Sequence, residues 1–196
     1  MQTTRQRWIA WAVALGSFAA ALGAGFAGVL VKVPMPWIAV RVWAGVGLLL
    51  AVYLGLPGRR RWVRSLRPTG LCLFHTWRIA PGTAFLLLLS EGTLPGEFAW
   101  AAGCGELLVG LSAPAVAVFV RAHSNPGRTA LFVWQLLGGA ELLGVMGLGI
   151  YSYRQSQSLL DSMSRFPLFL LPLYAVPLTL AVHVLAGVNL WPRRRR

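Results

Sequence analysis

The chain has 196 residues, of which 57% are hydrophobic and only 12% are charged, and its mean hydropathy is +0.65. Soluble domains carry about 25% charged residues, so this composition excludes an ordinary soluble domain and indicates a membrane protein. The 18 basic residues outnumber the 5 acidic ones, but the arginines cluster in short gaps between apolar runs. That distribution favours contact with a lipid bilayer and its anionic headgroups, and we expect no nucleic-acid partner.

Six apolar stretches are long enough to cross a bilayer, which takes about 20 helical residues. The first is longer than the apolar core of a signal peptide, about 7–15 residues, so we interpret it as a retained span. No segment between the stretches is long enough for a soluble domain. The sequence therefore predicts one all-α domain over residues 1–196, a polytopic bundle with spans at about 8–31, 37–56, 69–89, 95–119, 128–151 and 166–190.

The charges of the loops predict the orientation of this bundle. One set of segments carries 13 basic residues: Arg5, Arg7, Arg59, Arg60, Arg61, Arg64, Arg67, Arg121, Arg128 and Arg193–Arg196. The opposite set carries three, Lys32, Arg154 and Arg165. Because basic residues accumulate on the cytoplasmic side, we expect both termini in the cytoplasm and the protein in the inner, cytoplasmic membrane.

The first stretch carries small residues at helical spacing. Gly16, Ala20, Ala24 and Gly28 form one row, and Ser17, Ala21 and Gly25 form a second row beside it. Lipid provides little hydrophobic drive for helix association, so helices in membranes pack closely along such small faces. Both rows are therefore predicted to help hold the bundle together.

Three charged residues lie inside the apolar stretches at nearly one depth. Arg78 is near the centre of the third span, Glu106 lies in the phrase GCGELLVG of the fourth, and Glu141 lies in GGAELLGV of the fifth. With a rise of about 1.5 Å per residue, both carboxylates fall within about two residues of the bilayer midplane. A charge facing lipid there costs at least ~2.5–3.5 kcal/mol, so we expect all three side chains to point inward, with Arg78 paired to a carboxylate.

Glycines at helical spacing accompany each charge and mark faces for close packing: Gly82 beside Arg78, Gly103 and Gly110 beside Glu106, and Gly138 and Gly144 beside Glu141. Since one arginine cannot neutralise two carboxylates, we hypothesise that one glutamate is protonated or that the two share a proton. The functional interpretation is a proton or ion relay, or a polar substrate site. The structural alternative is a buried salt bridge that fixes helix register.

The histidines suggest a rival site. His75 in the third span and His183 in the sixth lie at matching depth, and such a pair could ligate a haem b iron or another metal. The spacing is weak evidence, and no metal site or required cofactor is predicted. Cys72 and Cys104 are interpreted as small buried hydrophobic residues. No catalytic sequence motif is present, so the chain is not predicted to be an enzyme.

The second half of the chain resembles a group of small bacterial six-helix integral membrane proteins with no established function. The likeness covers about residues 72–190 and includes an arginine in the third span, a loop ending in Leu-Pro, an acidic residue after Gly-x-Gly, a second acidic residue after a Trp-Asn phrase, and a histidine in a proline-rich last span. The matching residues here are Arg78, Leu94-Pro95, Glu106, Glu141 and His183. The chain has glutamate where the group has aspartate, and Gln135 where it has asparagine. The resemblance implies one polar constellation but no substrate.

Three hypotheses follow from the sequence. The first is a small transporter or proton- or ion-coupled membrane protein that uses Arg78, Glu106 and Glu141, supported by His183. The second is a non-catalytic accessory or scaffold subunit, with a second copy or another membrane subunit as its partner. The third is a haem- or quinone-binding electron carrier that uses His75 and His183. Substrate, coupling ion and oligomeric state are not predicted.

Overall fold

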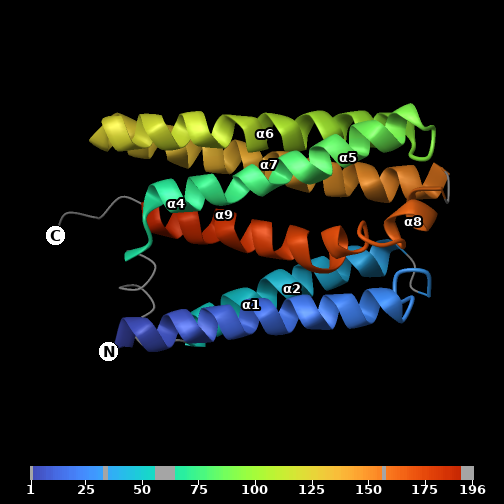
Figure 1. The fold of residues 1–196 in the computed structure, drawn as a ribbon, viewed down its shortest axis with the longest axis horizontal. Coiled ribbons are helices and arrows are strands. Elements are labelled where there is room, and N and C mark those ends of the chain that lie inside the picture. Colours follow the sequence, from blue (N-terminus) through green and yellow to red (C-terminus); the bar gives the residue numbers. More distant parts are fainter. Residues whose placement is uncertain (1, 33–34, 56–64, 156–157, 191–196) are drawn as a thin grey trace.

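The computed structural model describes residues 2–32, 35–55, 65–155 and 158–190. Within these ranges all regular structure is helical, which confirms the all-α prediction (Figure 1). The elements are α1 Gln2–Phe26, α2 Met35–Gly55, α4 Pro68–Phe74, the 3₁₀ helix η1 His75–Arg78, α5 Ile79–Ser90, α6 Gly96–Ala122, α7 Ser124–Gln155, α8 Ser158–Met163, the π-helix η2 Leu171–Ala175 and α9 Val176–Leu190.

Four helical stretches are long and apolar enough to cross a membrane: Pro68–Ser90, Gly96–Ala122, Pro126–Gln155 and Leu171–Leu190. They correspond to the last four predicted spans, although the last begins at Leu171 and not at about residue 166. The other two apolar helices of the described ranges, Trp11–Phe26 and Val40–Ala51, are shorter. They lie within the first two predicted spans.

The first predicted span extends too far at its C-terminal end. Helix α1 ends at Phe26 because Gly28 has a positive φ of 68°. The amide of Gly28 donates to the carbonyl of Gly25, and that of Val29 donates to the carbonyl of Ala24. This pair of hydrogen bonds is a Schellman motif, which closes a helix with glycine in the left-handed conformation. Gly92, with φ of 67°, ends α5 in the same way.

The long helices lie roughly parallel or antiparallel in a bundle (Figure 1). Helix α6 packs against α5 and α7, α7 packs against α9, and α9 packs against α2. Helix α1 is peripheral and contacts the rest of the bundle mainly through η2. The beginning of α1 and the end of α9 lie at the same end of the bundle, as a chain with both termini on one side of a membrane requires (Figure 1).

Only one of the two small-residue rows of α1 is packed. Ala21 and Gly25 are buried, and a side chain at Gly25 would overlap the ring of Phe169. Gly16 and Ala20 of the other row are exposed. The prediction that both rows hold the bundle together is therefore half right, because α1 has neighbours on only one side.

The core has a polar layer between two apolar clusters. One cluster, built around Phe85, Phe98 and Leu159, lies at the end of the bundle that holds α8. The other, built around Cys72, Ala113 and Leu131, lies toward the opposite end. Arg78 falls between Cys72 and Phe85 along the chain, and Glu106 falls between Phe98 and Ala113. The charged residues are thus at mid-length of their helices, with apolar packing on both sides.

Many of the arginines that predict the orientation lie outside the described residues. The arginine-rich segments at residues 59–64 and 193–196 and the side chains of Arg5 and Arg7 belong to this part of the chain. The predicted cytoplasmic location of both termini therefore stays a prediction.

Candidate functional site

Arg78 reaches the centre of the bundle from a local break in helix geometry. The helical stretch Pro68–Ser90 changes from α to 3₁₀ over His75–Arg78 and then returns to α. A 3₁₀ helix has three residues per turn, so side chains three positions apart lie directly above one another. His75 and Arg78 therefore share one face, and both are fully buried, with 0% of their surface exposed.

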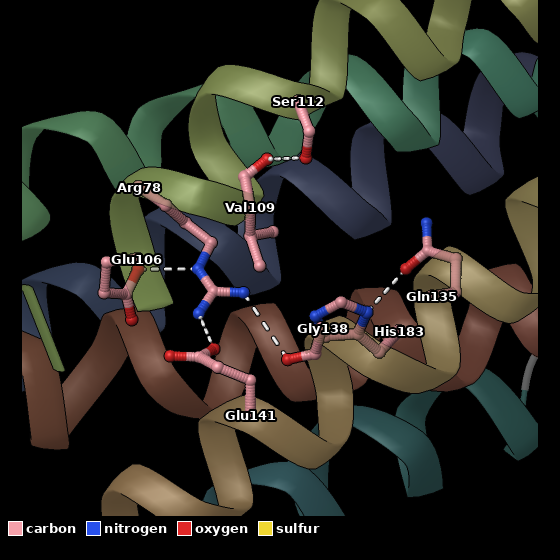
Figure 2. Close-up of polar contacts among 8 residues, drawn as sticks. All are labelled: Arg78, Glu106, Val109, Ser112, Gln135, Gly138, Glu141 and His183. Atoms are coloured by element: carbon pink, nitrogen blue, oxygen red, sulfur yellow. Dashed lines mark hydrogen bonds and ion pairs between the residues drawn. The ribbon is translucent and has the colours of Figure 1, made fainter. Parts of the chain in front are cut away.

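The guanidinium of Arg78 lies between two carboxylates from different helices (Figure 2). Its Nε donates to Oε2 of Glu106 on α6 at 2.6 Å, and its Nη2 donates to Oε2 of Glu141 on α7. Its Nη1 points to the carbonyl oxygen of Gly138, at 3.5 Å. The three charged residues that were expected to converge are in direct contact, and Arg78 joins three helical elements.

Glycines bring α6 close enough for these contacts. A Cβ atom placed on Gly110 would lie 2.8 Å from the backbone nitrogen of Ile79, and one on Gly82 would lie 2.9 Å from that of Leu107. Real Cβ atoms do not approach backbone so closely, so only glycine fits at this contact between α5 and α6. Gly103 is in similar contact with Leu86. The expectation that glycines beside Glu106 and Arg78 mark packing faces is confirmed.

The glycines beside Glu141 behave differently. Gly138 packs against the ring of His183, where a Cβ atom would lie 3.0 Å from Cε1. Gly144 is exposed and has nothing within 4 Å of such an atom. The expectation of packing at Gly144 is therefore wrong. Gly105 of α6 takes this role, because a side chain there would overlap the carboxylate of Glu141.

The cluster holds more negative than positive charge. Arg78 contributes one positive charge, and Glu106 and Glu141 contribute two negative charges when both are ionised. The side chains of Arg78, Glu106 and Glu141 are 0%, 7% and 21% exposed. Oε1 of Glu141 is buried and has no hydrogen-bond partner among the described residues. This oxygen could therefore carry a proton while Oε2 of Glu141 stays on Arg78.

The two histidines form a stacked pair beside the charged cluster. Their ring centroids are 4.2 Å apart, with 25° between the ring planes. Nδ1 of His183 lies 2.5 Å from Oε1 of Gln135, and the ring of His75 meets that of Trp134 edge to face. His183 also touches Gly138, whose carbonyl group faces Arg78 (Figure 2). The histidine pair is thus connected to Arg78 through one residue of α7.

This stacking bears on the haem hypothesis. Two axial histidines hold their coordinating nitrogens on opposite sides of the iron, about 4 Å apart, with the porphyrin between the two rings. In the structure the faces of His75 and His183 are in contact, so no space for a porphyrin separates them. Among the described residues no three His, Cys, Asp or Glu side chains are grouped to hold a metal ion.

Cys72 is fully buried and donates to the carbonyl of Ala113, while Cys104 is half-buried.

A cavity of about 110 Å³ lies next to the charged cluster. Glu106 forms part of its wall, and the other polar contributors are Trp77 and Thr179. Nε1 of Trp77 and Oγ1 of Thr179 are buried and have no hydrogen-bond partner within the described residues. The remaining wall is apolar and comes from α2, α5, α6, α7, α8, η2 and α9, with Leu30 added from the turn after α1.

Sequence reasoning did not assign three residues of this region to the site. Gln135 appeared only as a departure from a related phrase, although it precedes Gly138 by one helical turn. Trp77 directly precedes Arg78, and Thr179 precedes His183 by four residues and so shares its face of α9. In each case the signal that could have found the residue was its position in the sequence relative to Gly138, Arg78 or His183.

Comparison with known proteins matches residues 35–191, most of the chain, to the model of a family described as a domain of unknown function (DUF8737). The matched region begins at α2 and includes every residue of the charged cluster, the histidine pair and all but one residue of the cavity wall; α1 lies outside it. No curated protein and no solved structure matches the chain.

Proposed function

Since the chain belongs to the DUF8737 family, whose description names no activity, we propose a function from the geometry of the site. The protein is a small multi-pass carrier that moves a proton or another cation across the membrane. The ion binds on the way at the cluster of Arg78, Glu106 and Glu141. His183, held by Gln135, supports this cluster through Gly138. The observation that carries the proposal is a fully buried guanidinium shared by two carboxylates, one of which lines a cavity.

The excess negative charge gives the coupling its physical basis. A net charge at mid-depth of a membrane is costly, so the cluster is most stable when a proton or a bound cation balances it. Because Arg78 is shared between Glu106 and Glu141, protonation of one carboxylate strengthens the ion pair between Arg78 and the other. A cation that enters at Glu106 would therefore compete with the proton, and this competition is what coupled transport requires.

We place this carrier in the cytoplasmic membrane with six spans and both termini in the cytoplasm. The four long apolar helices support this arrangement, as does the exposure of large apolar side chains along α6 and α7, such as Leu108, Val118 and Leu137. The arginine-rich loops would then contact anionic headgroups on the cytoplasmic side. Helices α1 and α2 would complete the six spans.

A scaffold subunit is the second candidate. Two features favour it. The ion pairs of Arg78 with Glu106 and Glu141 would fix the register of α6 and α7, and the small-residue row of α1 that includes Gly16 and Ala20 is exposed. A scaffold requires the charged cluster only for stability and moves no proton. The two functions therefore differ in a measurable flux.

Proton flux in liposomes tests the proposal. The purified protein is reconstituted in liposomes that contain a pH-sensitive dye, and a potassium diffusion potential is applied. We expect acidification with the wild type and its loss with Glu106→Gln and Glu141→Gln. Glu97→Gln, at an exposed glutamate in the first turn of α6, is the matched control and should retain the flux. Equal flux in all four proteins, each checked for folding by gel filtration, would favour the scaffold.

A further inference from the structure

The cavity beside Glu106 has a mainly apolar wall with a few polar groups. Most of its wall consists of apolar side chains, among them Phe85, Phe98, Leu142 and Val145. Its polar part comes from Glu106, Trp77 and Thr179. A site that combines an apolar wall with a few polar groups is typical of binding sites for small organic molecules.

The polar groups of the wall select the charge of the occupant. The carboxylate of Glu106 keeps only one of its oxygens on Arg78, through Oε2. The hydroxyl of Thr179, 1% exposed in the residue as a whole, has no hydrogen-bond partner among the described side chains and backbone. Both groups accept hydrogen bonds, and the indole of Trp77 is the aromatic ring that attracts cations best. An ammonium group can donate to Glu106 and to Thr179 and can lie against the indole ring of Trp77, although it cannot accept from the Nε1–H of that ring. A carboxylate would be repelled by Glu106.

The volume limits the size of the occupant. An apolar cavity of about 150 Å³ is known to hold benzene, and this cavity measures about 110 Å³. It therefore accommodates a body of about four or five carbon atoms, or a single small ring if the side chains of the wall shift. Leu159 and Met163 of α8 are buried and belong to the wall, so this short helix covers part of the cavity.

We propose that this cavity binds a small organic cation, a protonated amine with a compact apolar body, whose ammonium group pairs with Glu106. The apolar body lies among the side chains of α5, α6 and α7. This assignment presupposes the proposed function and names its substrate class: the amine is the cation that balances the charge of the cluster in place of a proton. Binding at neutral pH therefore releases a proton.

Binding of n-butylammonium tests the assignment. Saturation-transfer NMR on the full chain in lipid nanodiscs, with empty nanodiscs subtracted, gives its dissociation constant, which we expect in the millimolar range for so small a ligand. The neutral match, 1-butanol, and the oversized tetrabutylammonium should bind at least about tenfold more weakly. Glu106→Gln should weaken n-butylammonium by at least about tenfold, since a charge-assisted pair is lost.

A second variant separates loss of the site from loss of the fold. Val145→Phe fills the cavity and leaves Glu106 and Arg78 in place, and it should abolish binding. Leu143→Phe, two residues away on the same helix and 42% exposed, is the matched control and should bind as the wild type does. Equal binding of 1-butanol and n-butylammonium, or unchanged binding in Val145→Phe, would overturn the assignment.

Measurements of proton release and proton flux distinguish failure of the amine site from failure of the proposed ion coupling. A pH-sensitive dye in weakly buffered solution should report about one proton released per n-butylammonium bound. Proton flux without any n-butylammonium binding would overturn the amine site and leave the coupling proposal standing. Binding that depends on Glu106, with neither proton release nor proton flux, would support the site and contradict the coupling.

Discussion

At the scale of the residue, Arg78 suits its place because of the shape of its side chain. The guanidinium is a rigid planar fork, and Arg78 uses three of its nitrogens for Glu106, Glu141 and the carbonyl of Gly138. A lysine carries the same charge on a single nitrogen and cannot face three acceptors along these directions. The site thus depends on the geometry of the donor as well as on its charge.

Substitution of Arg78 should separate these two contributions. Arg78→Leu leaves two buried carboxylates without a partner, and we expect a loss of about 3–5 kcal/mol in the free energy of unfolding. Arg78→Lys keeps the charge and should lose less, about 1–3 kcal/mol. Unfolding in detergent micelles, followed by circular dichroism, measures both. Arg121→Lys, at an exposed position in α6, is the control and should change little; equal stability of Arg78→Lys and wild type would contradict the geometric role.

At the scale of the element, the contact between α5 and α6 sets the position of Glu106. The two helices approach through Gly82, Gly103 and Gly110, and backbone as well as side-chain atoms face Gly82 and Gly110. Backbone cannot move aside locally, so an added methyl group pushes the whole of α6 away from α5. The pair between Arg78 and Glu106 spans this same contact, and it therefore lengthens when the helices separate.

Alanine substitution tests this coupling between packing and the site. Gly110→Ala places a Cβ atom 2.8 Å from the nitrogen of Ile79, and we expect a loss of about 1–3 kcal/mol. Gly144→Ala, with open space around it, should be neutral or slightly stabilising, because alanine favours helix over glycine by about 1 kcal/mol. Thermal unfolding of the two variants side by side makes the comparison. Equal stability would mean that the contact is not tight.

At the scale of the whole molecule, the two ends of the polar layer are unlike. The cavity extends from Glu106 toward Leu159 and Met163 of α8, whereas the histidine pair lies on the side of Cys72 and the start of α4. In the orientation that we propose, the cavity faces the outer half of the membrane and the histidines face the cytoplasmic half.

Cysteine labelling tests this orientation. In a background where Cys72 and Cys104 are replaced by alanine, Asp161→Cys in α8 and Arg121→Cys at the end of α6 introduce single exposed thiols at opposite ends of the bundle. A membrane-impermeant maleimide should label Asp161→Cys on intact cells, and Arg121→Cys only after the cells are permeabilised. The cysteine-free background is the control. The reverse pattern would invert the proposed topology.

The sequence predicted the depth of residues along each helix better than the rotation of the helices about their axes. Depth follows from counting residues along a helix of fixed rise, so the common level of Arg78, Glu106 and Glu141 was predictable. Which side of each helix faces its neighbour depends on the packing of all the helices together. For that reason Gly144 of α7 was assigned to a packing contact beside Glu141 that Gly105 of α6 makes instead. The 3₁₀ turn at His75–Arg78 has no marker in its composition, and the cavity combines residues from distant parts of the chain.

The partners of Arg78 have a consequence for biosynthesis. Glu106 and Glu141 follow Arg78 by 28 and 63 residues, so a ribosome completes the helical stretch Pro68–Ser90 well before either carboxylate exists. Released alone into lipid, that segment would carry an unbalanced cation at its centre, at a cost of at least ~2.5–3.5 kcal/mol. In the proposed topology, the segment would avoid this cost by leaving the protein-conducting channel together with α6, which carries Glu106. The order of synthesis, with Arg78 first and its two carboxylates later, then becomes part of how the ion cluster is assembled.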